Sequence, residues 1–184
     1  TIDGPSASGK GSLAKALAKE LNFNLLDSGL LYRAYSYCFN NSKNHSFAKD
    51  LFSHLNIKSI NNEMHVFENG KDITSILRNE DVAKSASELS SFRETRENLI
   101  SFQRDLASNQ GLVADGRDMG TVVFPDAGTK IFLVADAEER AKRRFLELQN
   151  AGQEVNMRDL IDDIRLRDEA DKEREISPLI PADD

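Results

Sequence analysis

The chain has 184 residues, 39% hydrophobic and 30% charged, which suits one compact globular unit. Its net charge of −7 argues against a protein that coats nucleic acid or an anionic membrane, because both partners attract basic surfaces. A single cysteine, Cys38, excludes an intramolecular disulfide and fits a reducing compartment, so we expect a cytoplasmic protein, which we take to be a monomer.

The first elements are a strand, a glycine-rich turn and a helix. Only residues 1–2 of the strand are present, without a starting methionine, so we expect the N-terminus to be truncated. The turn covers residues 4–12, and apolar residues then recur at helical spacing over residues 13–21. Residues 23–26 predict a second short strand, followed by another helix.

A small antiparallel insertion is predicted at residues 57–75. Residues 57–60 and 64–67 have the composition of short strands, and Asn69-Gly70 is a turn signal.

The second half of the chain alternates helices with apolar strands. Two amphipathic helices are expected within residues 79–108, buried strands at 111–115 and 130–134, and helices over 137–151 and from 156 onward. This alternation predicts a three-layer α/β/α domain with a parallel sheet and right-handed crossovers. No apolar run approaches the ~20 residues that span a bilayer, and no signal peptide is visible. The chain stops after a polar stretch, so we expect this end to be truncated as well.

The strongest motif is the glycine-rich turn, which fits the pattern G-x-x-x-x-G-K of a phosphate-binding loop. Glycines let backbone N–H groups converge on phosphate oxygens, and the helix N-terminus adds its positive end. The alternative is a turn that only caps a helix. Nucleoside triphosphate binding does not by itself say where the phosphate goes. The predicted ATP-binding residues are Gly4, Pro5, Ser6, Ala7, Ser8, Gly9, Lys10, Gly11 and Ser12, with the Ser12 hydroxyl facing Mg²⁺.

A polar cluster follows the second strand, at the carboxyl edge of the sheet where α/β proteins bind ligands. Asp27 and Ser28 are both able to cap the next helix. Ser28 can also donate to a phosphate, and Arg33 can clamp the same anion. A capped helix with a solvated arginine fits these residues equally well.

Residues 114–120 form a second polar cluster, directly after an apolar strand and therefore at the same sheet edge. Asp115 can orient Mg²⁺ through water, while Arg117 and Asp118 can bind an acceptor phosphate and a base edge. The alternative is a local Asp–Arg pair that closes a tight turn.

Two further clusters lie on predicted helices. Arg140, Arg143 and Arg144 share one helical face, where their mutual repulsion would be relieved by a transferring phosphoryl group. Neighbouring glutamates also allow a solvated, salt-bridged face. Arg167, Asp171 and Arg174 share a face of the last helix, where they fit either an acceptor site or a solvated charged surface.

Together these pieces resemble the bacterial cytidylate kinases, over essentially the whole chain. The most specific segment is Asp115-Gly-Arg-Asp-Met-Gly-Thr-Val-Val-Phe-Pro, since the phosphate loop is common to many NTPases. The remaining similarity lies in Ile2-Asp3-Gly4-Pro5-Ser6, Leu26-Asp27-Ser28-Gly29 with Tyr32-Arg33, and Glu138-Glu139-Arg140-Ala141.

The resemblance implies a nucleoside monophosphate kinase fold with a five-stranded parallel core, and Mg²⁺-dependent transfer from ATP to CMP or dCMP. It implies a core of residues 1–39, 92–142 and 156–184, a monophosphate-binding region with its insertion at 40–91, and a mobile lid at about 143–155. In that family the chain continues past this end with another strand and helix.

Site residues follow from the same resemblance. Ser28, Arg33, Arg96 and Arg117 would hold the acceptor phosphate, and Asp27 would lie beside them. Ser87, Asp118 and Arg167 would read cytosine or support that contact, and Asp171 and Arg174 would engage the pentose. The implied catalytic residues are Lys10, Arg117, Arg143 and Arg144, and the implied metal contacts are Ser12 and, through water, Asp115.

Two other functions remain open at this point. The same fold would serve a kinase of another small acceptor, although the surroundings of Asp118 favour cytosine. A nucleotide-dependent switch protein is the alternative from a different class. Against it, the chain has no guanine-reading Asn-Lys-x-Asp, and the DxxG spacing fails because Asp118 stands three residues after Asp115.

Overall fold

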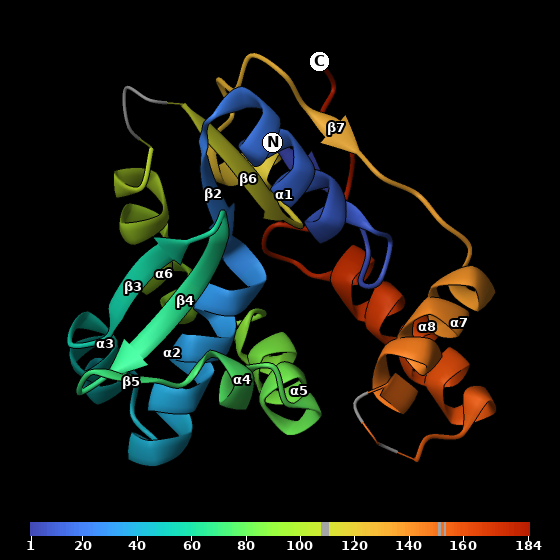
Figure 1. Ribbon diagram of the computed structural model, residues 1–184, viewed down its shortest axis with the longest axis horizontal. Coiled ribbons are helices and arrows are strands. Elements are labelled where there is room, and N and C mark those ends of the chain that lie inside the picture. Colours follow the sequence, from blue (N-terminus) through green and yellow to red (C-terminus); the bar gives the residue numbers. More distant parts are fainter. Residues whose placement is uncertain (108–110, 151, 153) are drawn as a thin grey trace.

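A computed structural model describes residues 1–107, 111–150, 152 and 154–184 (Figure 1). The helix ends predicted at 108 and 151, and two positions of the predicted lid, lie outside the described residues. The elements are β1 (Ile2–Asp3), α1 (Lys10–Leu21), β2 (Asn24–Asp27), α2 (Ser28–Ser42), α3 (His45–Ser53), β3 (Asn56–Ile60), β4 (Glu63–Glu68), β5 (Lys71–Asp72), α4 (Thr74–Leu77), α5 (Glu80–Leu89), α6 (Arg93–Asp105), β6 (Leu112–Gly116), the π-helical turn η1 (Met119–Val123), β7 (Ile131–Phe132), α7 (Ala137–Asn150) and α8 (Met157–Glu173).

The core sheet is parallel, with strand order β2-β6-β1-β7. The register aligns Asp115 with both Asp27 and Ile2, so three neighbouring strands end at one edge. Strand β7 is shorter than the predicted 130–134, because the two residues of β1 pair only with Ile131 and Phe132.

The five-stranded sheet implied by the resemblance is wrong for the described residues, which place four strands in the core sheet. The segment after α8 runs as coil. It contains Pro178 and Pro181, which lack the backbone N–H that a strand ladder needs.

Helices cover both faces of this sheet, which confirms the predicted three layers. Leu25 and Val113 pack with Ala14 of α1 on one face. Leu26 and Ala114, their neighbours along β2 and β6, pack on the other face against α2 and α6. Successive strand residues point to opposite faces, so this alternation directs β2 and β6 into two apolar clusters.

The predicted antiparallel insertion is confirmed as a three-stranded sheet in the order β3-β4-β5. Its central strand touches the core twice. Glu63 forms an ion pair of 2.8 Å with Lys15 of α1, and the backbone N–H of Asp27 donates to Met64 Sδ. The insertion therefore rests on the same sheet edge as the phosphate loop.

Helices α7 and α8 lie side by side on the other side of the molecule (Figure 1). Arg140 of α7 and Asp168 of α8 join them through a buried, two-pronged ion pair. Within the described part of the chain, no helix combines the length and the apolarity needed to cross a membrane.

Candidate active site

A cavity of about 280 Å³ opens where β1, β2 and β6 end. All ten residues predicted for the acceptor line it, as do Lys10, Asp115 and Arg144. Of the predicted phosphate loop, Ser6 and Ala7 also reach it. Gly4, Pro5, Ser8, Gly9, Gly11, Ser12 and Arg143 are not part of this lining. The ten acceptor-side residues are Asp27, Ser28, Arg33, Ser87, Arg96, Arg117, Asp118, Arg167, Asp171 and Arg174.

The phosphate loop leads from β1 into α1. Gly9 caps the helix with a φ of 94°, a left-handed conformation that favours glycine. Gly4 lies so close to β7 that a Cβ there would stand 2.4 Å from the carbonyl oxygen of Leu133. Lys10 is the first residue of α1, and its Nζ donates to the carbonyl of Pro5 at 3.0 Å. The loop thus has the tight backbone that its glycines predicted.

Lys10, which is buried, and Asp115, which is partly buried, both line the cavity. Burial, reinforced by the positive charge of Arg117, lowers the pKa of Lys10 to about 7. Burial also raises the pKa of Asp115 to about 6, although the charge of Lys10 opposes that rise. A phosphate group bound beside Lys10 would favour its charged form.

The polar cluster after β2 is built on a capped helix. Asp27 is the N-cap of α2, and its Oδ1 accepts from the backbone N–H of Leu30 at 2.9 Å. Ser28 donates to Gln103 Oε1 at 3.0 Å. Arg33 donates to the carbonyls of Leu77 and Asn79, and burial lowers its pKa to about 10. Both readings of this cluster therefore hold in part, since Asp27 caps the helix while all three predicted side chains reach the cavity.

Arg96 and Asp118 form a buried ion pair inside the cavity wall. Arg96 also lies over the ring of Tyr32, 5.6 Å from its centroid, and donates to the carbonyl of Ser90 at 2.9 Å. The local Asp–Arg pair considered as an alternative for residues 115–118 is wrong, because Asp118 pairs with Arg96 from α6.

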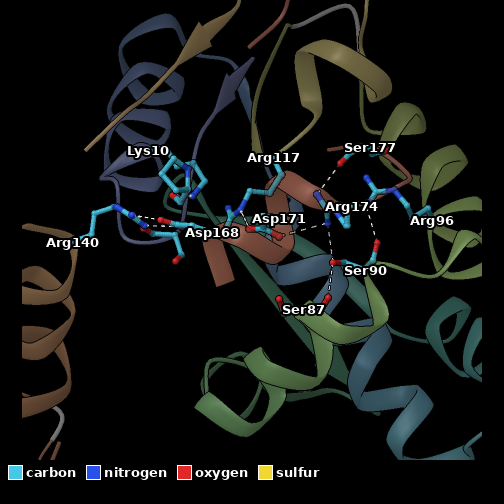
Figure 2. A network of polar contacts seen from close by, with 12 residues as sticks. Lys10, Ser87, Ser90, Arg96, Arg117, Arg140, Asp168, Asp171, Arg174 and Ser177 are labelled. Atoms are coloured by element: carbon cyan, nitrogen blue, oxygen red, sulfur yellow. Dashed lines mark hydrogen bonds and ion pairs between the residues drawn. The ribbon is translucent and has the colours of Figure 1, made fainter. Parts of the chain in front are cut away.

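Helix α8 contributes a charged face to the cavity, with Asp171 beside Arg117 (Figure 2). Arg117 Nε donates to Asp171 Oδ2 at 2.9 Å. Burial would raise the pKa of Asp171, but Arg117 and Arg174 outweigh it and hold the pKa below its ordinary value. Arg167 Nε is buried without a hydrogen-bond partner among the described residues, and burial lowers the pKa of Arg167 to about 10. This face is therefore not the solvated charged surface that spacing alone allowed.

The three arginines of α7 separate into different roles. The prediction that Arg140 faces the transferring group beside the other two is wrong, because Arg140 is buried against Asp168 and donates to the carbonyls of Ala135 and Ser6. Arg143 donates to the carbonyl of Ser8 at 3.1 Å, beside the phosphate loop. Arg144 lines the cavity and pairs with Glu80 of α5.

The charge of the cavity suits anions. Four carboxylates line it, those of Asp27, Asp115, Asp118 and Asp171, against eight cationic side chains. Arginine grips phosphate oxygens in pairs, so such a surplus in a confined space favours a ligand with several phosphates. The cations are Lys10, Arg33, Arg78, Arg96, Arg117, Arg144, Arg167 and Arg174.

Sequence reasoning missed several residues of this site. Arg78 and Ser90 line the cavity, and Gln103 accepts a hydrogen bond from the Ser28 hydroxyl. Arg78 carried one usable signal, a lone arginine between a short apolar segment and a helix start. Ser90 and Gln103 carried none, because their partners lie far away in the chain.

The residues present fit Mg²⁺ as an ion shared with a phosphate ligand. Within the described part of the chain, no three His, Cys, Asp or Glu residues are placed to hold a metal by themselves. A Cβ on Gly11 would lie 3.2 Å from Asp115 Oδ2, so this carboxylate lies against the first turn of α1, which contains Ser12. One carboxylate and one hydroxyl are hard oxygen donors of the kind Mg²⁺ takes when phosphates and water complete its shell.

A phosphate loop, a parallel sheet and an arginine-lined acceptor cavity at one sheet edge define a P-loop kinase of the nucleoside monophosphate class. The family model for cytidylate kinase matches residues 1–184, and the chain belongs to the cytidylate kinase family. It is 46% identical over 190 residues to cytidylate kinase 2 of Haemophilus influenzae, covering all of this chain and 86% of that protein. Cytidylate kinases of Pseudomonas putida and Mannheimia succiniciproducens are also 46% identical, over 84% of their lengths.

Proposed function

We propose that this chain transfers the γ-phosphoryl group of ATP to CMP and dCMP, with Mg²⁺, using the residues that line the described cavity. An oxygen of the acceptor phosphate attacks the γ-phosphorus in line, the bond to the β-phosphate oxygen breaks, and CDP or dCDP leaves with ADP. The observation that carries the proposal is the convergence of ten acceptor-side residues, from five separate segments, on one cavity with surplus positive charge.

On the acceptor side, the proposal assigns the CMP phosphate to Ser28, Arg33, Arg96 and Arg117, all of which line the cavity. Ser87 and Asp118, which is buried against Arg96, take the cytosine edge, with Arg167 in support. Asp171 and Arg174 take the pentose. Because Arg96 and Asp118 are already paired and buried, their side chains lose little conformational entropy when the acceptor binds.

On the donor side, the proposal assigns the β- and γ-phosphates to the backbone of residues 4–12 and to Lys10. Arg143 and Arg144, in the middle of α7, would turn toward the transferring group. Their charges then oppose the negative charge that spreads over the equatorial oxygens in the transition state.

Ser12 and Asp115 would hold Mg²⁺, Asp115 through a water molecule. Bound there, the ion supplies charge neutralisation between the β- and γ-phosphates. The proposal also treats residues 143–155 as a lid whose closure excludes water, since an open phosphate loop would hydrolyse ATP.

The proposal takes the protein to be cytoplasmic and monomeric. Light scattering after size-exclusion chromatography checks the oligomeric state. Its domain division assigns residues 1–39, 92–142 and 156–184 to the core, and 40–91 to the monophosphate-binding region.

A coupled ADP-release assay with Mg²⁺ and ATP tests the proposal, with CMP, dCMP, UMP, AMP or no acceptor. Strong stimulation by CMP and dCMP alone is the expected result. Stimulation by a different monophosphate would contradict the assignment of CMP as the acceptor but would still support kinase activity. ADP release equal to the blank in every reaction, with a partner-dependent change on ATP binding, would favour a switch protein instead.

A further inference from the structure

Ser90 lies between α5 and α6, lines the cavity and is buried. Three of its bonds connect separate parts of the site (Figure 2). Its carbonyl accepts from Arg96 at 2.9 Å, and its Oγ lies 3.0 Å from Arg174 Nη1 and 2.7 Å from the carbonyl of Ser87. One serine thus contacts Arg96, which pairs with the base-side Asp118, the pentose-side Arg174 and the backbone of Ser87, a predicted cytosine contact.

The direction of this chain of bonds is fixed by the chemistry of the hydroxyl. A serine hydroxyl has one proton and two lone pairs. A carbonyl only accepts, so the proton of Ser90 goes to Ser87, and the guanidinium of Arg174 only donates, so Ser90 accepts from it. Donation therefore runs from Arg174 to Ser90 and from Ser90 to Ser87. The reverse direction is impossible, because a guanidinium cannot accept and a carbonyl cannot donate.

The contact matters because Arg174 is held by few groups. Its Nη1 donates to Ser90, its Nη2 donates to the carbonyl of Ser177 at 2.9 Å, and Asp171 lies 3.7 Å from Nη1. Its Nε is buried without a partner among the described residues. Ser90 and Ser177 thus fix the plane of the guanidinium.

We propose that Ser90 is a positioning residue for the acceptor nucleotide, acting through Arg174. It sets Arg174 against the pair formed by Arg96 and Asp118, so that the pentose and base contacts keep one spacing. This role rests on the proposed function, because it concerns the same acceptor. Ser90 itself donates its only proton within the protein and is not a catalytic residue.

Ser91 provides a matched control. Its Oγ donates to the carbonyl of Glu88 at 2.7 Å, the same local bond that Ser90 makes to Ser87. Ser91 is exposed and does not line the cavity. Ser91→Ala therefore removes the local bond without touching an arginine.

The experiment measures KM for CMP and for ATP in the ADP-release assay. We expect Ser90→Ala to raise KM for CMP roughly tenfold, as loss of a charge-assisted hydrogen bond does, and to leave KM for ATP within about twofold. Ser91→Ala leaves both constants unchanged. In an Arg174→Ala background, Ser90→Ala adds less than about twofold, because its effect passes through Arg174.

Three results would overturn the role of Ser90. These are an unchanged KM for CMP in Ser90→Ala, an equal rise in both KM values together with a lower unfolding midpoint, or full additivity with Arg174→Ala. A wild-type protein that releases no ADP in response to CMP would instead overturn the proposed function, and this role with it.

Discussion

The two sides of the cavity are held by different kinds of ion pair. On the acceptor side, Arg96 pairs with Asp118, and both side chains are at most 10% exposed. On the side of α7, Arg144 pairs with Glu80, whose side chain is 50% exposed. Breaking a buried pair leaves an uncompensated charge, whereas an exposed pair exchanges readily with water. The Arg96–Asp118 pair is thus built to stay in place, whereas Arg144 is able to change partners.

This difference matches the two tasks of phosphoryl transfer between nucleotides. The acceptor must be oriented before reaction, since a misplacement of about 1 Å costs much of the rate. In the proposed mechanism, Arg144 leaves Glu80 to meet the transferring group as the site closes. A fixed Arg96–Asp118 pair and an exchangeable Arg144–Glu80 pair would meet both needs.

Lys10→Ala tests the donor side and should have the largest effect. We expect kcat to fall by about 10²–10³-fold, because a preorganised charge at the transferring phosphates is lost. Steady-state ADP release with saturating CMP measures this change. CMP binding without ATP, followed by calorimetry, should stay unchanged if the two sides are independent. A loss of kcat below tenfold would contradict the assignment of Lys10.

Asp118→Ala tests the buried pairs of the acceptor side. It leaves the charge of Arg96 buried without its partner, so the free energy of unfolding should fall by about 3 kcal/mol. KM for CMP should rise as well. Urea denaturation measures the first effect. Glu147→Ala, which breaks the exposed pair with Arg144 inside α7, is the control and should cost under about 1 kcal/mol. Equal costs would remove the distinction between the two sides.

Motifs placed directly after strands could be predicted from the sequence. Asp27 is the last residue of β2 and Asp115 lies near the end of β6, and parallel strands bring their carboxyl ends to one edge whatever the rest of the chain does. The strand order itself gives β1, β2 and β6 as neighbours, so these clusters meet. Local position therefore sufficed to bring the clusters at residues 27–33 and 115–118 to one edge, whereas Ser87 and Arg96 were predicted only from the family resemblance.

Contacts between distant segments could not be predicted in this way. Ser28 and Gln103 are 75 positions apart, and Ser90 and Arg174 are 84 apart. Arg140 shows the resulting error. Its spacing to Arg143 matched a phosphate-facing cluster, but its partner is Asp168 on a different helix, and no periodicity within α7 contains that information. The turn η1 was missed for the same reason, since its N–H groups bind the distant Asp3.

Proton uptake tests the electrostatics of the donor side. Burial lowers the pKa of Lys10 from 10.5 to about 7, so the unfolded chain binds more protons between these values, and this contribution to stability rises with pH there. ATP phosphates favour charged Lys10, so ATP binding at pH 8 should take up protons. Uptake of one full proton changes the binding free energy by about 1.4 kcal/mol per pH unit. Calorimetry in two buffers of different ionisation enthalpy measures the uptake. Wild-type protein without uptake, or Lys10→Met with the same uptake, would contradict this prediction.

Glu80→Gln tests the exchangeable pair and should have the smallest effect. Arg144 must leave Glu80 before it can meet the transferring group, so removing that competitor should raise kcat/KM for ATP, by a factor of about five or less. The gain should shrink as salt is added, because an exposed pair is screened. Glu147→Gln is the control, since Glu147 lies on α7 with Arg144 and does not connect the two sides. If Glu80→Gln lowers kcat/KM instead, then the pair belongs to the closed, reacting conformation, and the α7 side is as fixed during transfer as the acceptor side.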